Sequence, residues 1–178
     1  MALTVEDGSG LPDADALVSM VVFKAYCDKR GYAYTTDELI EQAIVRATAF
    51  MSDSFAWAGW RVKGRGATGG AQALAWPRYA VTDEGGYTVP SDSVPVEVVE
   101  STIEIALLEL GEPGAMTPTY VPGDRVKSEK FDTIAFEYDL SSQGAESVRP
   151  VLLVVRDKIG AFLARGTGTS VSGSVVRG

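Results

Sequence analysis

Residues 35–54 read TTDELIEQAIVRATAFMSDS and carry the clearest secondary-structure signal of the chain. Apolar side chains recur in this stretch at the spacing of one helical face. They are Leu39, Ile40, Ala43, Ile44, Ala47, Phe50 and Met51. The opening Thr35-Thr-Asp-Glu38 has the pattern of a capping box, in which a threonine oxygen and a glutamate three residues later bond each other's backbone amides. The stretch therefore predicts an amphipathic helix at about 36–54 that buries one face.

Further helices are expected on both sides of this stretch. Ser19 can cap a helix over 20–30, and Gly31 is a suitable stop. A third helix is expected from the segment 93–95 to about 110, and its many apolar residues make it the most buried one. A last helix is expected over 150–164, whereas residues 126–138 alternate as a strand does.

These elements predict a mainly α fold, a small helical bundle with a short β-hairpin or extended segment and long loops. The length of 178 residues suits one domain with a core of its own. We expect an N-terminal arm at 1–18, the helical-bundle domain at 19–165 with a long loop at 55–92, and a flexible tail at 166–178. The tail is rich in Gly, Ser and Thr and has no periodic apolar face.

Composition excludes several kinds of catalytic and metal site. The chain has no histidine and a single cysteine, Cys27. This removes histidine-based acid–base and nucleophilic catalysis, a structural zinc site within one chain, and an internal disulfide. We therefore expect no enzyme activity, no cofactor and no bound metal. No apolar run approaches the roughly 18 residues that span a bilayer, and the start lacks the pattern of a signal peptide, so no membrane association is expected.

A glycine-rich stretch, GRGATGG at Gly64–Gly70, contains the spacing GxGxxG of a dinucleotide-binding turn. That turn requires a strand before the glycines and a helix after them, whose N-terminus holds the pyrophosphate. Residues 61–63 are a poor strand, and only six residues follow Gly70 before Pro77. We interpret the stretch as a flexible loop without a nucleotide.

The same region is the one locally basic part of an acidic chain. Trp57, Trp60 and Trp76 alternate with four cations and no acid, although the net charge of the chain is −8. The aromatic rings could stack nucleobases, as in proteins that bind single strands. They could instead fasten a long loop to the core. Because the net charge opposes phosphate binding, we favour fastening and leave base stacking as the alternative.

Several motifs, in their order, resemble a family of phage proteins. They are Leu17–Tyr26 with Arg30-Gly31, Glu41–Thr48 followed by Trp60-Arg61, Ala73–Arg78 (ALAWPR), Val94-Pro95, and Val126–Tyr138. The chain resembles the head–tail connector, or adaptor, family of tailed bacteriophages, whose members are often labelled DnaT-like single-stranded DNA-binding proteins. The resemblance covers residues 17–165.

The resemblance implies a structural virion protein at the head–tail junction, made in the cytoplasm of the bacterial host. Twelve copies, by analogy, would form a ring below the portal protein and above a head-closure, stopper or tail-completion protein. DNA would pass through the lumen without specific recognition, and a negative net charge suits such sliding. The alternative is a DnaT-like replication protein that binds single-stranded DNA.

Two segments are candidate partner contacts. The first is the tail, expected to dock on the portal or on a neighbouring subunit through Arg165, Val171, Val175, Val176 and Arg177, unless it is a disordered end without a role. The second is the basic loop, expected to face a partner through Trp60, Arg61, Lys63, Arg65 and Arg78.

Overall fold

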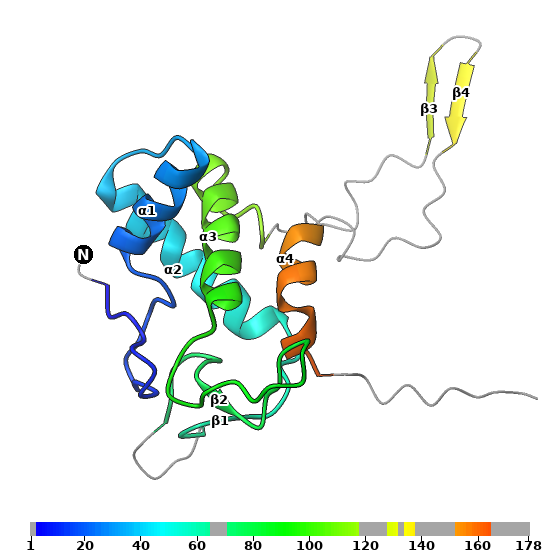
Figure 1. Cartoon of the computed structure of the whole chain (residues 1–178). Coiled ribbons are helices and arrows are strands. Elements are labelled where there is room, and N and C mark those ends of the chain that lie inside the picture. Colours follow the sequence, from blue (N-terminus) through cyan, green and yellow to red (C-terminus); the bar gives the residue numbers. More distant parts are fainter. Residues whose placement is uncertain (1–2, 65–70, 118–127, 132–133, 138–151, 165–178) are drawn as a thin grey trace, which may run out of the picture.

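The computed structural model describes residues 3–64, 71–117, 128–131, 134–137 and 152–164. Within these ranges the chain forms four α-helices, α1 (Met20–Arg30), α2 (Asp37–Ser54), α3 (Val96–Gly111) and α4 (Leu153–Ile159), and α4 continues into a 3₁₀ turn, η2 (Gly160–Phe162) (Figure 1). Two short antiparallel pairs accompany the helices, β1 (Trp60–Arg61) with β2 (Arg78–Tyr79), and β3 (Ser128–Phe131) with β4 (Ile134–Glu137). The predicted mainly α fold is confirmed.

The core lies where α2, α3 and α4 pack together. α2 lies along one side of α3 and α4 along the other, and α1 touches both α2 and α3 (Figure 1). α3 contributes Val98, Ile103, Ile105 and Ala106 to the core, all completely buried. α3 is thus covered on two sides. This agrees with its sequence, in which apolar residues occupy most of the helix circumference and leave only a narrow polar strip.

A hydrogen bond, a cation–ring contact and an ion pair hold α1 and α4 in place along the partly exposed side of α3. The hydroxyl of Tyr26 donates a hydrogen bond to Glu104, and the guanidinium of Arg30 lies 3.6 Å from the centre of the Tyr26 ring. On the other side, Lys158 of α4 pairs with Glu100. These contacts fix three helices against one another with partly buried polar groups.

The boundaries of α1 follow the sequence signals, whereas the start of α2 departs from them. Ser19 accepts a hydrogen bond from the amide of Val22, and Gly31 ends α1 with φ of 70°, as predicted. The capping box predicted at Thr35–Glu38 is wrong. α2 takes Thr36 as its N-cap, without a side-chain bond, so Glu38 lies one position too early in the helix to return the bond.

Residues 3–18, expected to be an arm, lie against the helices. Ala14, Ala16, Leu17 and Val18 are buried in the core, and an isolated parallel bridge joins Val5 to Ala16. The buried carboxylate of Glu6 accepts three backbone amides of the turn that follows, those of Gly8, Gly10 and Leu11. A carboxylate can be buried when its oxygens accept hydrogen bonds, and these three bonds hold the turn at residues 8–11 in place.

The remaining elements agree with the sequence in part. β3 and β4 form the hairpin expected within 126–138, with Phe131 opposite Ile134, and Figure 1 draws it apart from the helices. α4 and η2 end at Phe162, two residues before the predicted end of the last helix, and its predicted start at Pro150 lies outside the described residues. No helix in the described ranges is long and apolar enough to cross a membrane.

Candidate nucleic-acid interface

A chain of aromatic rings fastens the long loop to the core. Edge-to-face contacts run from Phe50 through Phe55 and Trp57 to Trp76 and then to Phe162 of η2, with ring centres 5.6 to 5.8 Å apart. Trp76 is completely buried, and the indole nitrogen of Trp57 donates to the carbonyl of Met51 over 3.1 Å. Two of the three tryptophans therefore have the fastening role that the sequence analysis favoured.

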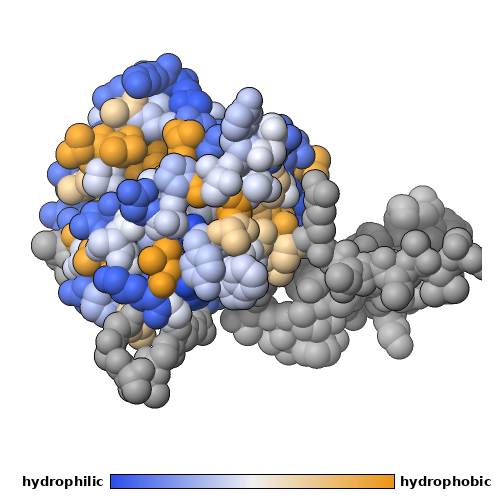
Figure 2. All heavy atoms as spheres, turned by 60° about the horizontal axis from the view of Figure 1, so that its bottom comes forward, coloured by the Kyte–Doolittle hydropathy of each residue, from blue (hydrophilic) through white to orange (hydrophobic). Residues whose placement is uncertain are grey.

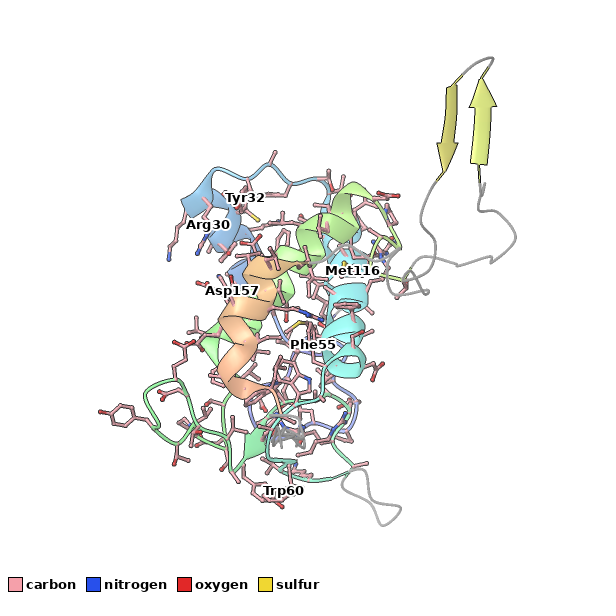
Figure 3. The ribbon with its side chains drawn as sticks, turned by 90° about the vertical axis from the view of Figure 1, so that its right-hand side faces the viewer. Arg30, Tyr32, Phe55, Trp60, Met116 and Asp157 are labelled. Carbon is pink, nitrogen blue, oxygen red and sulfur yellow. The ribbon has the colours of Figure 1, made fainter. Side chains whose placement is uncertain are left out.

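The third tryptophan lies on the surface. Trp60 of β1 is directly opposite Tyr79 of β2, and the two rings stack with centres 5.4 Å apart and planes 28° from parallel. Trp60 is 62% exposed and Tyr79 is 47% exposed. Figure 3 shows Trp60 projecting from the end of the molecule opposite Arg30 and Tyr32. The ribbon formed by β1 and β2 thus presents an aromatic surface to solvent, which we call the aromatic ribbon.

The aromatic ribbon depends on a glycine at its entry. Gly59 has φ of 62°, and a Cβ atom at this position would lie 2.1 Å from the carbonyl oxygen of Tyr79. Only glycine allows this backbone conformation together with so close an approach. Gly59 therefore brings β1 within pairing distance of β2 and places Trp60 opposite Tyr79.

Arg78 holds the ribbon from behind. Its side chain is buried and donates to four backbone carbonyls, Nε to Ala58 over 2.6 Å, Nη1 to Ala75 over 3.1 Å, and Nη2 to Trp57 over 3.3 Å and Gly59 over 2.7 Å. Burial, followed by the nearby charge of Arg61, lowers the pKa of this guanidinium. Arg78 was a candidate partner contact, but its donors face the inside of the loop, so its role is structural.

Two other cations of the basic loop follow Trp60 within three residues, and the first of them, Arg61, is paired with Arg78 across the ribbon. Arg61 is half-buried, and its Nη1 donates to the carbonyls of Gln72 over 3.2 Å and Ala73 over 3.1 Å. Lys63 is exposed. Residues 54–82 contain no acid, although Asp7, from another part of the chain, lies close enough to Lys63 to interact with its charge. Arg65, also a candidate, lies outside the described residues.

The described residues on both sides of the glycine-rich stretch lack the elements of a dinucleotide-binding turn. The amide of Gln72 donates to the carbonyl of Gly64 over 3.0 Å and closes the base of the loop. The buried side chain of Gln72 donates to the carbonyls of Leu74 and Pro77. Residues 71–77 form no helix, so the anion-binding helix N-terminus of a dinucleotide turn is missing where it would have to follow. The predicted flexible loop itself lies almost entirely outside the described residues, which resume at Ala71.

The face around the ribbon is mixed in character. Figure 2, which turns the lower end of Figure 1 toward the viewer, shows hydrophobic side chains scattered among hydrophilic ones on this face. Among the described residues no cluster of acids and cysteine is arranged to hold a metal ion. Exposed rings beside positive charges are suited to bind flat aromatic groups that carry phosphate, which is the chemistry of an unpaired nucleic-acid strand.

Comparison with protein families agrees with that chemistry. A family model described as "Putative DnaT-like ssDNA binding protein" matches residues 1–178, the whole chain. The chain belongs to this family. Comparisons with curated proteins and with solved structures give no significant match.

Membership of the DnaT-like family corrects the main functional prediction. The match supports the alternative of a single-stranded DNA-binding protein, and it gives no support to a head–tail connector subunit with portal, head-closure or tail-completion proteins as partners. That prediction took the net charge of −8 as evidence against DNA binding. Binding depends on the local charge, and residues 54–82, which contain the ribbon, carry four cations and no acid. The expected location in the virion depended on the same interpretation, and no observation tests it.

Sequence reasoning missed one residue of this interface. Tyr79 was not among the candidates, although it directly follows Arg78 in the sequence. The signal was weak, because only the pairing of β1 with β2 shows that Tyr79 lies opposite Trp60. The candidate residues of the tail, Arg165, Val171, Val175, Val176 and Arg177, lie outside the described residues, so the structure does not test them, and the portal as their partner is corrected together with the connector prediction.

Proposed function

We propose that this DnaT-like protein binds single-stranded DNA by stacking bases on Trp60 and Tyr79. The observation that carries the proposal is the exposed, stacked aromatic pair on a ribbon that Arg78 holds in place. A ring that stacks on a base contributes about 1–3 kcal/mol to binding of a strand. Membership of the DnaT-like family independently supports this class of ligand.

The phosphates of the strand would follow the positive side of the ribbon. Lys63 is exposed and follows Trp60 by three residues in the sequence. Arg61 is held by the carbonyls of Gln72 and Ala73, so it contributes a fixed positive potential. The rings supply base contacts and the cations supply phosphate contacts.

The ligand is a single strand because its bases are open to stacking. In a duplex the faces of the bases are covered by their neighbours, so Trp60 would have to push them apart. Every base offers a flat face, so binding on this ribbon is tolerant of sequence. Catalysis is not part of the proposal, because the chain contains no histidine and the ribbon needs no reaction to bind a strand.

Calorimetric titration with a thymidine oligonucleotide tests the proposal. Trp60→Ala and Tyr79→Ala should each raise Kd about tenfold, the equivalent of roughly 1.4 kcal/mol of lost stacking, and Trp60→Phe should restore much of the affinity. Tyr87→Ala is the matched control, because Tyr87 is a tyrosine that is 76% exposed in another turn. An unchanged Kd in the Trp60→Ala, Tyr79→Ala double variant, with normal thermal stability, would refute the proposal.

A further inference from the structure

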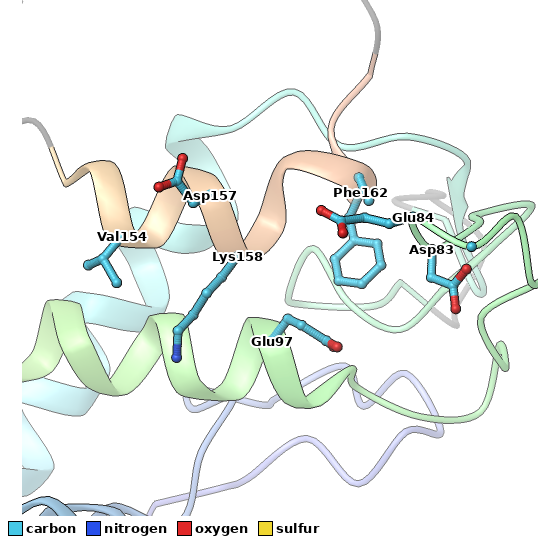
Figure 4. Close-up of a pocket in the computed structure, with 9 residues that line it drawn as sticks. Asp83, Glu84, Glu97, Val154, Asp157, Lys158 and Phe162 are labelled. Carbon is cyan, nitrogen blue, oxygen red and sulfur yellow. The ribbon is translucent and has the colours of Figure 1, made fainter.

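A second surface lies away from the aromatic pair, in a groove between α3, α4 and the turn after β2. The groove has a volume of about 670 Å³, and Figure 4 shows side chains from these three segments around it. Its apolar part comes from one side of α4 and η2, through Val154, Ala161 and Phe162. Val154 is 49% exposed, so α4 presents an apolar strip that no described segment covers.

The rim of this groove is acidic. Asp83, Glu84, Glu97 and Asp157 line it, and the close-up shows that they come from the turn after β2, from α3 and from α4 (Figure 4). Lys158 also lines the groove, but it pairs with Glu100. Within the described residues no cation pairs with Glu84, Glu97 or Asp157, so the rim keeps a negative charge.

The groove continues to the point where the described chain ends. An adjoining hollow shares Asp83, Glu84 and Ala161 with it and extends along Gly160 to Leu163. The described part of the chain ends one residue later, at Ala164. The segment that follows Ala164 thus begins at the mouth of a groove with an apolar floor and an acidic rim.

We propose that this acidic groove binds the chain's own C-terminal segment, residues 165–178. The segment reads RGTGTSVSGSVVRG, with two arginines, three valines and no acid, so both its charge and its apolar residues complement the groove. Fourteen residues can extend about 46 Å at 3.3 Å each, which lets the segment turn back along α4. A segment tethered at the groove has an effective local concentration on the order of millimolar, so weak contacts suffice. This inference is independent of the proposed DNA binding.

Paramagnetic broadening in the full-length chain tests the inference. Ser174→Cys provides a site for a spin label, because Cys27 is completely buried and its thiol is inaccessible. At low salt the backbone amide NMR signals of residues 83–86 and 157–162 should lose intensity when the label is present. Glu84→Lys with Asp157→Lys should restore those signals, since the rim would then repel the arginines of the tail.

The matched control reverses two acids outside the groove. Asp13→Lys with Glu112→Lys changes the net charge by the same amount at exposed positions, and it should leave the broadening in place. Broadening that the groove variant does not reduce, or no broadening at all, would overturn the proposal. Broadening seen only between labelled and unlabelled chains in a mixed sample would also overturn it, because the occupant would then be the tail of a second copy.

Discussion

Arg78 uses one side chain to hold four backbone carbonyls behind the aromatic ribbon. A guanidinium can do this because its donors are spread over a rigid plane, whereas a lysine has three donors on one atom. The carbonyls come from both sides of the loop, since Ala58 and Gly59 precede β1 and Ala75 precedes β2. The single side chain of Arg78 thus fixes the positions of Trp60 and Tyr79.

Replacing Arg78 by lysine should therefore lower the stability of the fold, although the positive charge is retained. Arg78→Lys leaves buried carbonyls unpaired, and we expect a loss of about 3 kcal/mol in the free energy of unfolding. Urea unfolding at pH 7 measures this loss. The control is Arg156→Lys, at an exposed position on α4, which should change stability by less than about 0.5 kcal/mol. A loss in Arg78→Lys as small as that of the control would contradict the structural role.

Residue patterns showed what kinds of residues form the interface but not how they are used. The cluster of cations and tryptophans in 57–78 is visible in the sequence. The sequence does not show that Trp60 is exposed while Trp57 and Trp76 are buried, because all three follow an irregular backbone without periodicity. Nor does it show that Arg78 faces inward, since that depends on which carbonyls the loop brings around it.

Among the secondary-structure elements, α2 and α3 are joined by an ion pair between the partly exposed Arg46 and the buried Glu109. Glu109 is almost completely buried, and it accepts from Arg46 Nε over 2.7 Å and from the amides of Gly114 and Met116. Burial acts to raise the pKa of Glu109, but the two amides and the charge of Arg46 outweigh it and hold the pKa below the ordinary value of a glutamate. The carboxylate is thus the stable form at neutral pH, and it closes the turn that follows α3.

This pair gives the α2–α3 contact a dependence on pH. Because the pKa of Glu109 is lower in the folded state than in the unfolded state, where it is about 4.3, the stabilisation is complete above that pH and is lost as the pH falls through the folded value. Glu109→Gln should lower the free energy of unfolding by about 2–3 kcal/mol at pH 7. The NH₂ group of the glutamine side chain would then face other donors, those of Arg46 and of the backbone amides.

Urea unfolding at a series of pH values from 7 to 3 checks this prediction. The stability difference between the parent chain and Glu109→Gln should shrink as the pH falls below about 4.3, where the unfolded glutamate binds a proton. Glu112→Gln, at an exposed position, serves as control and should show no such trend. A difference that stays constant from pH 7 to pH 3 would rule out the ionised pair as its source.

At this scale the sequence was most informative where an element is long and periodic. α1, α2 and α3 begin and end within three residues of their predicted bounds, because caps and apolar stripes are local signals. The two-residue strands β1 and β2 were missed for the opposite reason. A pair of two-residue strands has too few residues for a period, and 16 residues, 62–77, separate them.

The whole molecule has a negative net charge, yet residues 54–82, which contain the aromatic ribbon, carry four cations and no acid. The salt dependence of binding tests whether these cations contact the strand. The observed affinity for a single strand should fall with salt, with a slope of about −0.7 in log K against log salt for each phosphate that is neutralised. Since Arg61 and Lys63 are the described cations that follow Trp60 within three residues, we expect a total slope between about −1 and −2.

Titrations at several salt concentrations measure this slope. Lys63→Gln should reduce its magnitude by about 0.7, whereas Lys29→Gln on α1, far along the chain from the ribbon, should leave it unchanged. A slope that is the same in the Lys63→Gln variant as in the parent chain would mean that the strand follows another path over the surface.

The separation of one exposed tryptophan from two buried ones gives the protein two independent optical signals. Trp60 reaches solvent and should dominate quenching by small solutes and by a stacked base, whereas Trp57 and Trp76 emit from a dry environment of other rings. Their emission should change only when the loop leaves the core. A single spectrum can thus distinguish a ligand that settles on the ribbon from a condition that unfolds the loop beneath it.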